Sequence, residues 1–143
     1  MRRRIYQACL SVVVALLLTM GVVFAQTSAR VLADIPFDFH VGNATLPSGQ
    51  YMIKSGFPTR DALSFQSRYG SRNAMTLTTA VSPSKGDGVA KLVFNRYGSN
   101  YFLSQVWNPS DSIVRGVWKS KAEMEVARNI HDTDTVAVAL KKQ

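Results

Sequence analysis

Two groups of histidine and aspartate residues are the side chains best suited to bind a metal or exchange protons. The first group lies in the N-terminal third of the chain and consists of Asp34, Asp38 and His40. The second group lies close to the C-terminus and consists of His131, Asp132 and Asp134. Imidazoles and carboxylates serve both metal binding and acid–base catalysis. A solvated strand face and a polar helix exit contain the same residue types, so we predict no metal site.

Motifs for other common reaction types are missing from the sequence. It contains no G-x-S-x-G nucleophile turn, no H-E-x-x-H zinc motif and no phosphate-cradling glycine loop. The acidic residues of the C-terminal helical segment, Glu123 and Glu125, lie on one short helix, which does not favour a carboxylate pair facing a cleft. We therefore predict no catalytic residue, no cofactor and a non-enzymatic protein. A hydrolytic enzyme ranks third among the functional hypotheses, after a binding module and a ligand carrier.

A short near-repeat supplies the one candidate binding surface. The segments FQSRYGSRN (65–73) and FNRYGSN (94–100) share a strand-ending Phe, then Arg-Tyr-Gly-Ser and an Asn. Glycine allows the positive φ of a tight hairpin, and Ser and Asn bond the turn backbone. If the two tips lie together, they form a basic and aromatic patch suited to sugars or acidic groups, made of Arg68, Tyr69, Arg72, Arg96 and Tyr97. Shared turn chemistry is the alternative explanation.

The first 25 residues have the pattern of a secretory signal. Arg2, Arg3 and Arg4 precede an uncharged apolar run that ends at Val23 and Ala25, the small residues a signal peptidase accepts. The alternative is a retained membrane anchor, which needs about 20 apolar residues. We expect a cleaved signal at 1–25, a single β-rich domain at 26–143, and export to the periplasm or cell exterior.

Cleavage after Ala25 changes the chemistry of the chain. It removes Cys9, the only cysteine, so the domain must be stabilised by packing without a disulfide. Loss of three arginines lowers the formal net charge from +8 to +5. This excess favours an anionic glycan or an envelope component as a partner, with simple solubility as the alternative. We expect no nucleic-acid partner and no integral membrane protein after cleavage.

The mature chain has the pattern of an antiparallel β protein. Ile35, Phe37, Phe39 and Val41 alternate with polar residues, which predicts a half-buried strand, either at an edge or bent at Pro36. A loop is predicted for GNATLPSG, followed by further strands: QYMIKS (with Tyr51 and Ile53 inward), ALSFQS, AMTLTTAV, VAKLVFN, NYFLSQVW and SIVRGVW. Gly-, Pro-, Asn- and Ser-rich breaks separate them. This spacing predicts a sandwich or barrel of about seven or eight strands.

One helix is predicted near the C-terminus, at about 121–130. Ser120 and Glu123 have the spacing of a capping box. An apolar stripe at helical spacing follows, made of Ala122, Val126, Ala127 and Ile130. After the helix, TVAVAL is either a last strand or a loose tail. Trp107 and Trp118 belong to an aromatic-rich region that we interpret mainly as core.

The order of these segments resembles a family of small secreted proteins common in Acidobacteria and related soil bacteria. The matching segments are IPFDFHVG, LPSGQY, RYGSNYFL and SKAEME, with Ser48 where the family has alanine. The resemblance implies export and a β-rich fold, and it transfers no activity or site.

Together these observations predict a small exported β domain that acts as an envelope-associated or ligand-binding module. The alternative is a barrel that carries a small apolar ligand in its interior, which barrels of about eight strands can enclose.

Overall fold

The computed structural model of this protein describes residues 30–56, 59, 61–81, 88–108 and 113–142. The predicted signal peptide and Cys9 lie outside the described residues. The elements are β1 Arg30–Ile35, β2 Phe39–Val41, β3 Ala44–Leu46, β4 Gly49–Ser55, β5 Ala62–Ser67, β6 Asn73–Val81, β7 Lys91–Tyr97, β8 Asn100–Asn108, β9 Ile113–Val117, α2 Lys121–Asn129 and β10 Thr133–Lys142.

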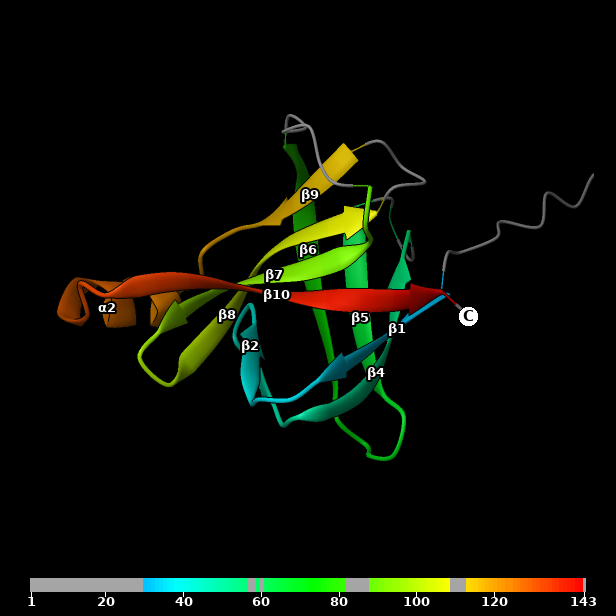
Figure 1. Ribbon diagram of the computed structural model, residues 1–143, viewed down its shortest axis with the longest axis horizontal. Helices are drawn as coiled ribbons and strands as arrows, with labels where there is room; N and C mark the ends of the chain where they lie inside the picture. The colour runs from blue at the N-terminus through cyan, green and yellow to red at the C-terminus, as the bar shows by residue number, and fades with distance from the viewer. Residues whose placement is uncertain (1–29, 57–58, 60, 82–87, 109–112, 143) are drawn as a thin grey trace, which may run out of the picture.

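Eight strands close into a barrel. The sheet order is β3-β2-β8-β7-β10-β1-β4-β5-β6-β9, and pairing of β8 with β9 closes the ring (Figure 1). All pairings are antiparallel except the single contact between β2 and β8. The predicted fold class is therefore confirmed as its barrel alternative, with one helix near the C-terminus. The segment TVAVAL forms part of β10, which pairs with both β7 and β1.

The first predicted strand is divided in two at Pro36. β1 ends at Ile35 and β2 begins at Phe39, because proline has no backbone N–H to donate to a ladder. The predicted alternation holds across the bend, since Ile35, Phe39 and Val41 are all buried. β1 pairs on both sides, so the edge-strand interpretation of Pro36 is wrong and the bend is right.

The β2–β3 hairpin lies in a gap of the barrel wall, between β8 and β6. β9 pairs with β6 only over Thr78–Val81, so the first half of β6 has no partner on that side. The hairpin lies there, paired with β8 through His40 and Phe102. The predicted loop over residues 42–49 is thus wrong in part, because it contains β3.

The barrel interior beside this hairpin is filled by aromatic rings. The ring of Phe39 lies 5.2 Å from that of Tyr51, 6.0 Å from Phe65 and 5.6 Å from Phe94, measured between centroids. Tyr51 and Ile53 point inward as predicted. Burial of these rings on β2, β4, β5 and β7 contributes to the apolar core that stabilises the barrel.

The helix α2 begins as predicted but buries a different face. The side chain of Ser120 caps it by accepting a hydrogen bond from the Glu123 backbone N–H at 3.1 Å. The predicted apolar stripe is wrong at its first position, because Ala122 is exposed and its neighbour Glu123 is only 2% exposed. The reason is that the β7–β8 hairpin offers polar donors to this face of the helix.

Candidate functional site

The outer surface of β6 carries an unusual row of exposed apolar side chains. Along this strand Ala74 and Thr78 point into the barrel and are buried. Met75 and Leu77 point outward and are 61% and 63% exposed. Large exposed side chains are ordinary when single, but a contiguous group of them marks an interaction surface.

A groove runs beside this row and is bordered by Trp118. It has a volume of about 540 Å³ and is lined by the β2–β3 turn, by Met75, Thr76 and Leu77 of β6, and by Trp118. The groove exists because β9 ends at Val117 and the chain then leaves the barrel towards α2. The indole of Trp118 is left 74% exposed at the point where the strand stops.

The turn of the β2–β3 hairpin forms the opposite wall of the groove. Gly42 has a positive φ of 58°, a conformation that glycine adopts without strain. A Cβ atom at this position would lie 3.6 Å from the Oγ1 of Thr76, so the turn approaches β6 closely. Gly42 therefore leaves this wall without a side chain at the position next to Thr76.

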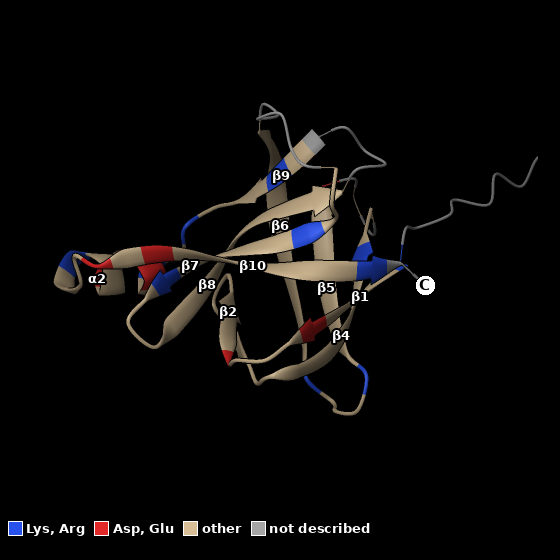
Figure 2. Ribbon diagram, in the orientation of Figure 1, with Lys and Arg blue, Asp and Glu red and all other residues tan. Residues whose placement is uncertain are grey.

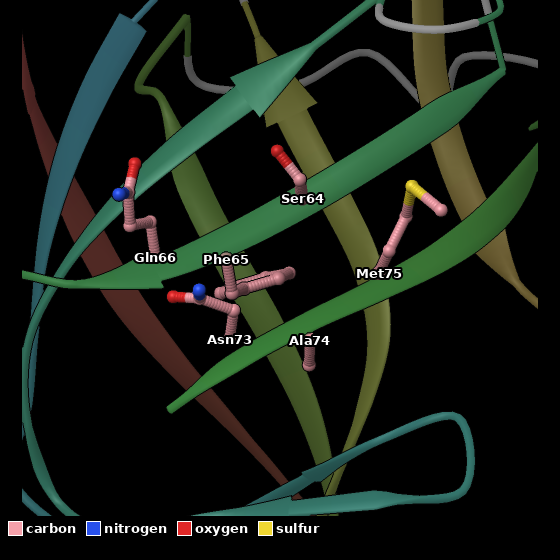
Figure 3. A pocket seen from close by; sticks show the side chains of 6 residues that line it. All are labelled: Ser64, Phe65, Gln66, Asn73, Ala74 and Met75. Carbon is pink, nitrogen blue, oxygen red and sulfur yellow. The ribbon is translucent and has the colours of Figure 1, made fainter. Parts of the chain in front are cut away.

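A second, smaller hollow of about 360 Å³ adjoins the groove across Met75, which lines both. Figure 3 shows Ser64, Gln66 and Met75 projecting from one side of the β5–β6 pair, while Ala74 projects from the other. Ser64 of β5 lies directly opposite Lys54 of β4 and Met75 of β6. We call the combined surface the β6 face, and it consists of Ser64, Gln66, Asn73, Met75, Leu77 and Trp118.

Three of the five residues of the predicted basic and aromatic patch border this face. Arg68, Tyr69 and Arg72 lie on the β5–β6 turn, and all three are exposed. Tyr69 is 81% exposed, and the guanidinium carbon of Arg68 lies 5.7 Å from the centroid of its ring. Arg72 directly precedes Asn73 of the β6 face.

The other two residues of the patch belong to a different region. Arg96 and Tyr97 lie on the β7–β8 hairpin, which reaches out beside α2, away from the β5–β6 turn (Figure 1). Tyr97 is only 2% exposed, and its hydroxyl donates to Oε1 of Glu123 at 3.3 Å. The interpretation of Tyr97 as a surface residue is wrong, because α2 covers its ring.

Glu123 joins the helix to the hairpin through a small polar cluster. Its Oε1 accepts hydrogen bonds from the Asn95 side chain at 2.9 Å and from the Tyr97 hydroxyl. A buried carboxylate is stable only when its oxygens are hydrogen-bonded. These donors therefore fix α2 on the hairpin, and the cluster serves the fold.

The first group of candidate metal ligands is divided among separate contacts. Asp38 accepts a hydrogen bond from the Ser48 backbone N–H at 2.8 Å, and Nδ1 of His40 lies 3.0 Å from the Thr45 hydroxyl. The His40 ring stacks on Phe102 at 4.4 Å, and its burial lowers the pKa of the imidazole. Within the described ranges, no three His, Cys, Asp or Glu residues are grouped closely enough to hold a metal ion.

Arg115 is a half-buried cation that the sequence analysis did not single out. It lies opposite Val106 in the β8–β9 ladder, and directly opposite residues share a face, so its side chain points into the barrel. Its Nη1 lies 3.3 Å from the carboxylate of Asp61, whereas its buried Nε has no hydrogen-bond partner. An unsatisfied buried donor of this kind requires an explanation.

The β6 face also escaped the sequence analysis, for a reason visible in the pattern. In AMTLTTAV the apolar Met75 and Leu77 alternate with threonines, which by itself predicts that they point inward. In the structure Met75 and Leu77 point outward instead, because pairing with β5 and β9 fixes the register of β6. Trp118 was predicted as the last residue of the strand SIVRGVW and interpreted mainly as core, and both interpretations are wrong for it, because β9 ends at Val117 and the indole is exposed.

Comparisons with known proteins returned no match: no family model, no curated protein and no solved structure matches this chain. In the part of the chain that the structure describes, no helix has the length and apolar character needed to cross a membrane.

Proposed function

We propose that this protein is a small exported binding protein without catalytic activity, and that it holds its ligand on the β6 face, outside the barrel. The observation that carries the proposal is the position of Trp118, 74% exposed beside Met75 and Leu77 on the edge of a groove. Ligand sites typically combine apolar and aromatic walls with a few polar groups. The signal-like residues 1–25 and the resemblance to a secreted family support export.

The polar groups of the described chain support the non-enzymatic part of the proposal. The carboxylates of Asp38, Asp61 and Glu123 accept hydrogen bonds from a backbone amide, an arginine and two side-chain donors respectively. These contacts stabilise turns and the helix. Turnover of a substrate that a single side-chain substitution abolishes would contradict this part.

Sedimentation with envelope fragments from the host tests the proposal. The purified protein is expected to sediment with the fragments, and Trp118→Ala is expected to weaken this binding about tenfold, because aromatic contacts dominate such surfaces. Trp107→Phe is the matched control and should bind within twofold of the wild type. Binding that is unchanged in Trp118→Ala would reject the β6 face as the site.

A second candidate function is transport of a small acidic ligand inside the barrel. The observation that favours it is the inward-pointing Arg115, whose Nε lacks a partner. A guanidinium at this position suits the carboxylate of an otherwise apolar ligand. The aromatic rings around Phe39 argue against a long ligand, because they occupy part of the barrel interior.

Native mass spectrometry of protein purified from its host separates the two candidates. A carrier should show a bound small molecule that is lost in Arg115→Gln and retained in Trp118→Ala. Protein without a bound molecule in any of the three forms would reject the carrier.

A further inference from the structure

We propose that the ligand of the β6 face is an anionic polysaccharide chain, of the kind built from uronic acids. The inference rests on the proposed function, since it takes this face as the binding surface and names the chemical class of its ligand. Three properties of the face support it: an exposed indole, a row of hydroxyl and amide groups, and flanking positive charge.

The apolar side chains of the face match one side of a sugar ring. Trp118 offers a flat indole surface, and Met75 and Leu77 extend this surface along β6. A pyranose presents C–H groups on its faces and hydroxyls at its edge, so its face packs on an aromatic ring while its edge stays hydrated. A groove open along its length accommodates a chain of such rings.

The polar side chains of the face match the hydroxyl edge of a sugar. Ser64, Gln66 and Asn73 line the hollow next to the groove and offer a hydroxyl and two amides (Figure 3). Amides donate and accept at once, which suits the hydroxyl groups of a glycan. Nζ of Lys54 donates to Oε1 of Gln66 at 3.2 Å, which orients this amide and brings a positive charge to the face.

Charge complementarity selects an acidic glycan over a neutral one. Four cations flank the face: Lys54 contacts Gln66, Arg68 and Arg72 lie in the β5–β6 turn, and Lys119 directly follows Trp118. Most acidic side chains of the described residues lie elsewhere, on α2, near the start of β10, and on or just after β1 (Figure 2). Asp61, which precedes β5, is engaged by Arg115. A basic surface of this kind raises the local concentration of an anionic chain and speeds its association.

The size of the apolar area argues against a second copy of the protein as the occupant. A stable protein interface buries about 800 Å² on each partner. Three exposed side chains, Trp118, Met75 and Leu77, fall well short of this area. A chain ligand needs only a narrow strip, and the two adjoining hollows provide one.

Calorimetric titration with the hexamer of galacturonic acid tests the inference. The uncharged hexamer of galactose serves as the probe of equal length. We expect the acidic hexamer to bind at least tenfold more tightly than the neutral one. Raising NaCl from 0.05 M to 0.5 M should weaken the binding several-fold, because screening shortens the range of the charges.

Two pairs of variants locate the binding. Trp118→Ala should weaken binding of the acidic hexamer about tenfold, whereas Trp107→Phe should not. Because Trp107→Phe leaves Trp118 as the only tryptophan, the fluorescence of this variant reports ligand contact at Trp118 directly. Arg72→Gln combined with Lys119→Gln should weaken binding about fivefold. Arg96→Gln combined with Arg128→Gln removes the same charge near α2 and should have no effect.

Equal binding of the two hexamers would overturn the inference, as would acidic binding that is insensitive to Trp118→Ala. Failure here is distinguishable from failure of the proposed function. If Trp118→Ala abolishes envelope binding while the acidic hexamer does not bind, the face is correct and the ligand class is wrong. If Trp118→Ala changes neither, both proposals fail.

Discussion

The β5–β6 turn and the β7–β8 turn contain the same tetrapeptide, Arg-Tyr-Gly-Ser, in opposite surroundings. Tyr69 of the first turn is 81% exposed, whereas Tyr97 of the second is 2% exposed. The glycines differ as well, since Gly98 has a φ of 61° and Gly70 is not among the positive-φ glycines. The first turn borders the β6 face, and the second anchors α2.

The difference shows that a turn motif does not determine what its side chains do. In the β7–β8 hairpin only Gly98 and Ser99 separate the paired residues Tyr97 and Asn100, which makes the turn tight. In the β5–β6 turn four residues separate Ser67 from Arg72, whose backbone groups are hydrogen-bonded. In the tight turn the ring of Tyr97 is buried and its hydroxyl donates to Glu123 of α2, whereas Gly98 and Ser99 stay exposed. In the wider turn the ring of Tyr69 stays exposed.

The largest expected difference between the two turns lies in their tyrosines. Tyr97→Ala should lower the free energy of unfolding by about 3–5 kcal/mol, because it removes a buried ring and leaves a cavity. Tyr69→Ala should change it by less than about 0.5 kcal/mol. Urea unfolding of both variants measures the effect, and similar values for the two would contradict the comparison.

The attachment of α2 to the β7–β8 hairpin depends on Glu123. Glu123→Ala should lower the free energy of unfolding by about 2 kcal/mol, because the Asn95 amide and the Tyr97 hydroxyl lose a shared acceptor. Glu125→Ala on the exposed side of α2 is the matched control and should be nearly neutral. A neutral Glu123→Ala would mean that α2 is held by its apolar contacts alone.

Substitution of the glycine in each turn should have a smaller effect on the free energy of unfolding. Gly98→Ala should cost about 1–2 kcal/mol, because a residue with a Cβ is disfavoured in the left-handed region. Gly70→Ala should cost less, since the nearest atom to the added Cβ is the Ser67 hydroxyl at 3.1 Å, which can rotate away. Thermal unfolding of the two variants ranks them, and the opposite order would refute this account of the turns.

The smallest expected effect is a pH dependence of stability. It should come from His40, which lies on the same side of the molecule as Tyr97. His40 stacks on Phe102, whose ring lies 5.9 Å from that of Tyr97. Burial lowers the pKa of His40 below its ordinary value of 6.5, so the folded protein binds fewer protons than the unfolded chain. This contribution to stability is present above pH 6.5 and is lost as the pH falls through the folded pKa.

Urea unfolding between pH 7.5 and 5 measures this dependence. The free energy of unfolding should fall with pH in the wild type and fall less steeply in His40→Gln, which retains a polar group for Thr45. His131→Gln replaces an exposed imidazole and should leave the slope of the wild type unchanged. An equal slope in His40→Gln would exclude His40 as the source.

Much of the fold was predictable because it depends on local patterns. The strands from QYMIKS to SIVRGVW were located by alternation and by the Gly- and Asn-rich breaks, and Ser120 located the start of the helix. The sequence did not decide whether Pro36 marks an edge strand or a bend, because proline lacks the N–H for a ladder hydrogen bond in either case. β3 was missed because three residues are too short for a periodic pattern.

The candidate site was less predictable, because it depends on which side of β6 faces the core. The alternation of Met75 and Leu77 with threonines is the same whether the apolar residues point inward or outward. A shift by one residue in strand pairing reverses every side chain. The two Arg-Tyr-Gly-Ser segments were equally uninformative. Arg68 and Arg96 have identical neighbours in the sequence, so the sequence does not indicate which of the two turns will contact the helix.

The amino-acid sequence by itself determined the class of fold, the helix and its cap, and the absence of cysteine from residues 26–143. These follow from local periodicity and residue chemistry, which need no long-range contact. Tertiary structure decided that the barrel closes, that Trp118 is exposed and that Tyr97 is buried. Closure depends on the pairing of β9 with β6 and β8. The exposure of Trp118 depends on β9 ending at Val117, and the polar contact of Tyr97 depends on the position of α2. Long-range packing sets all three.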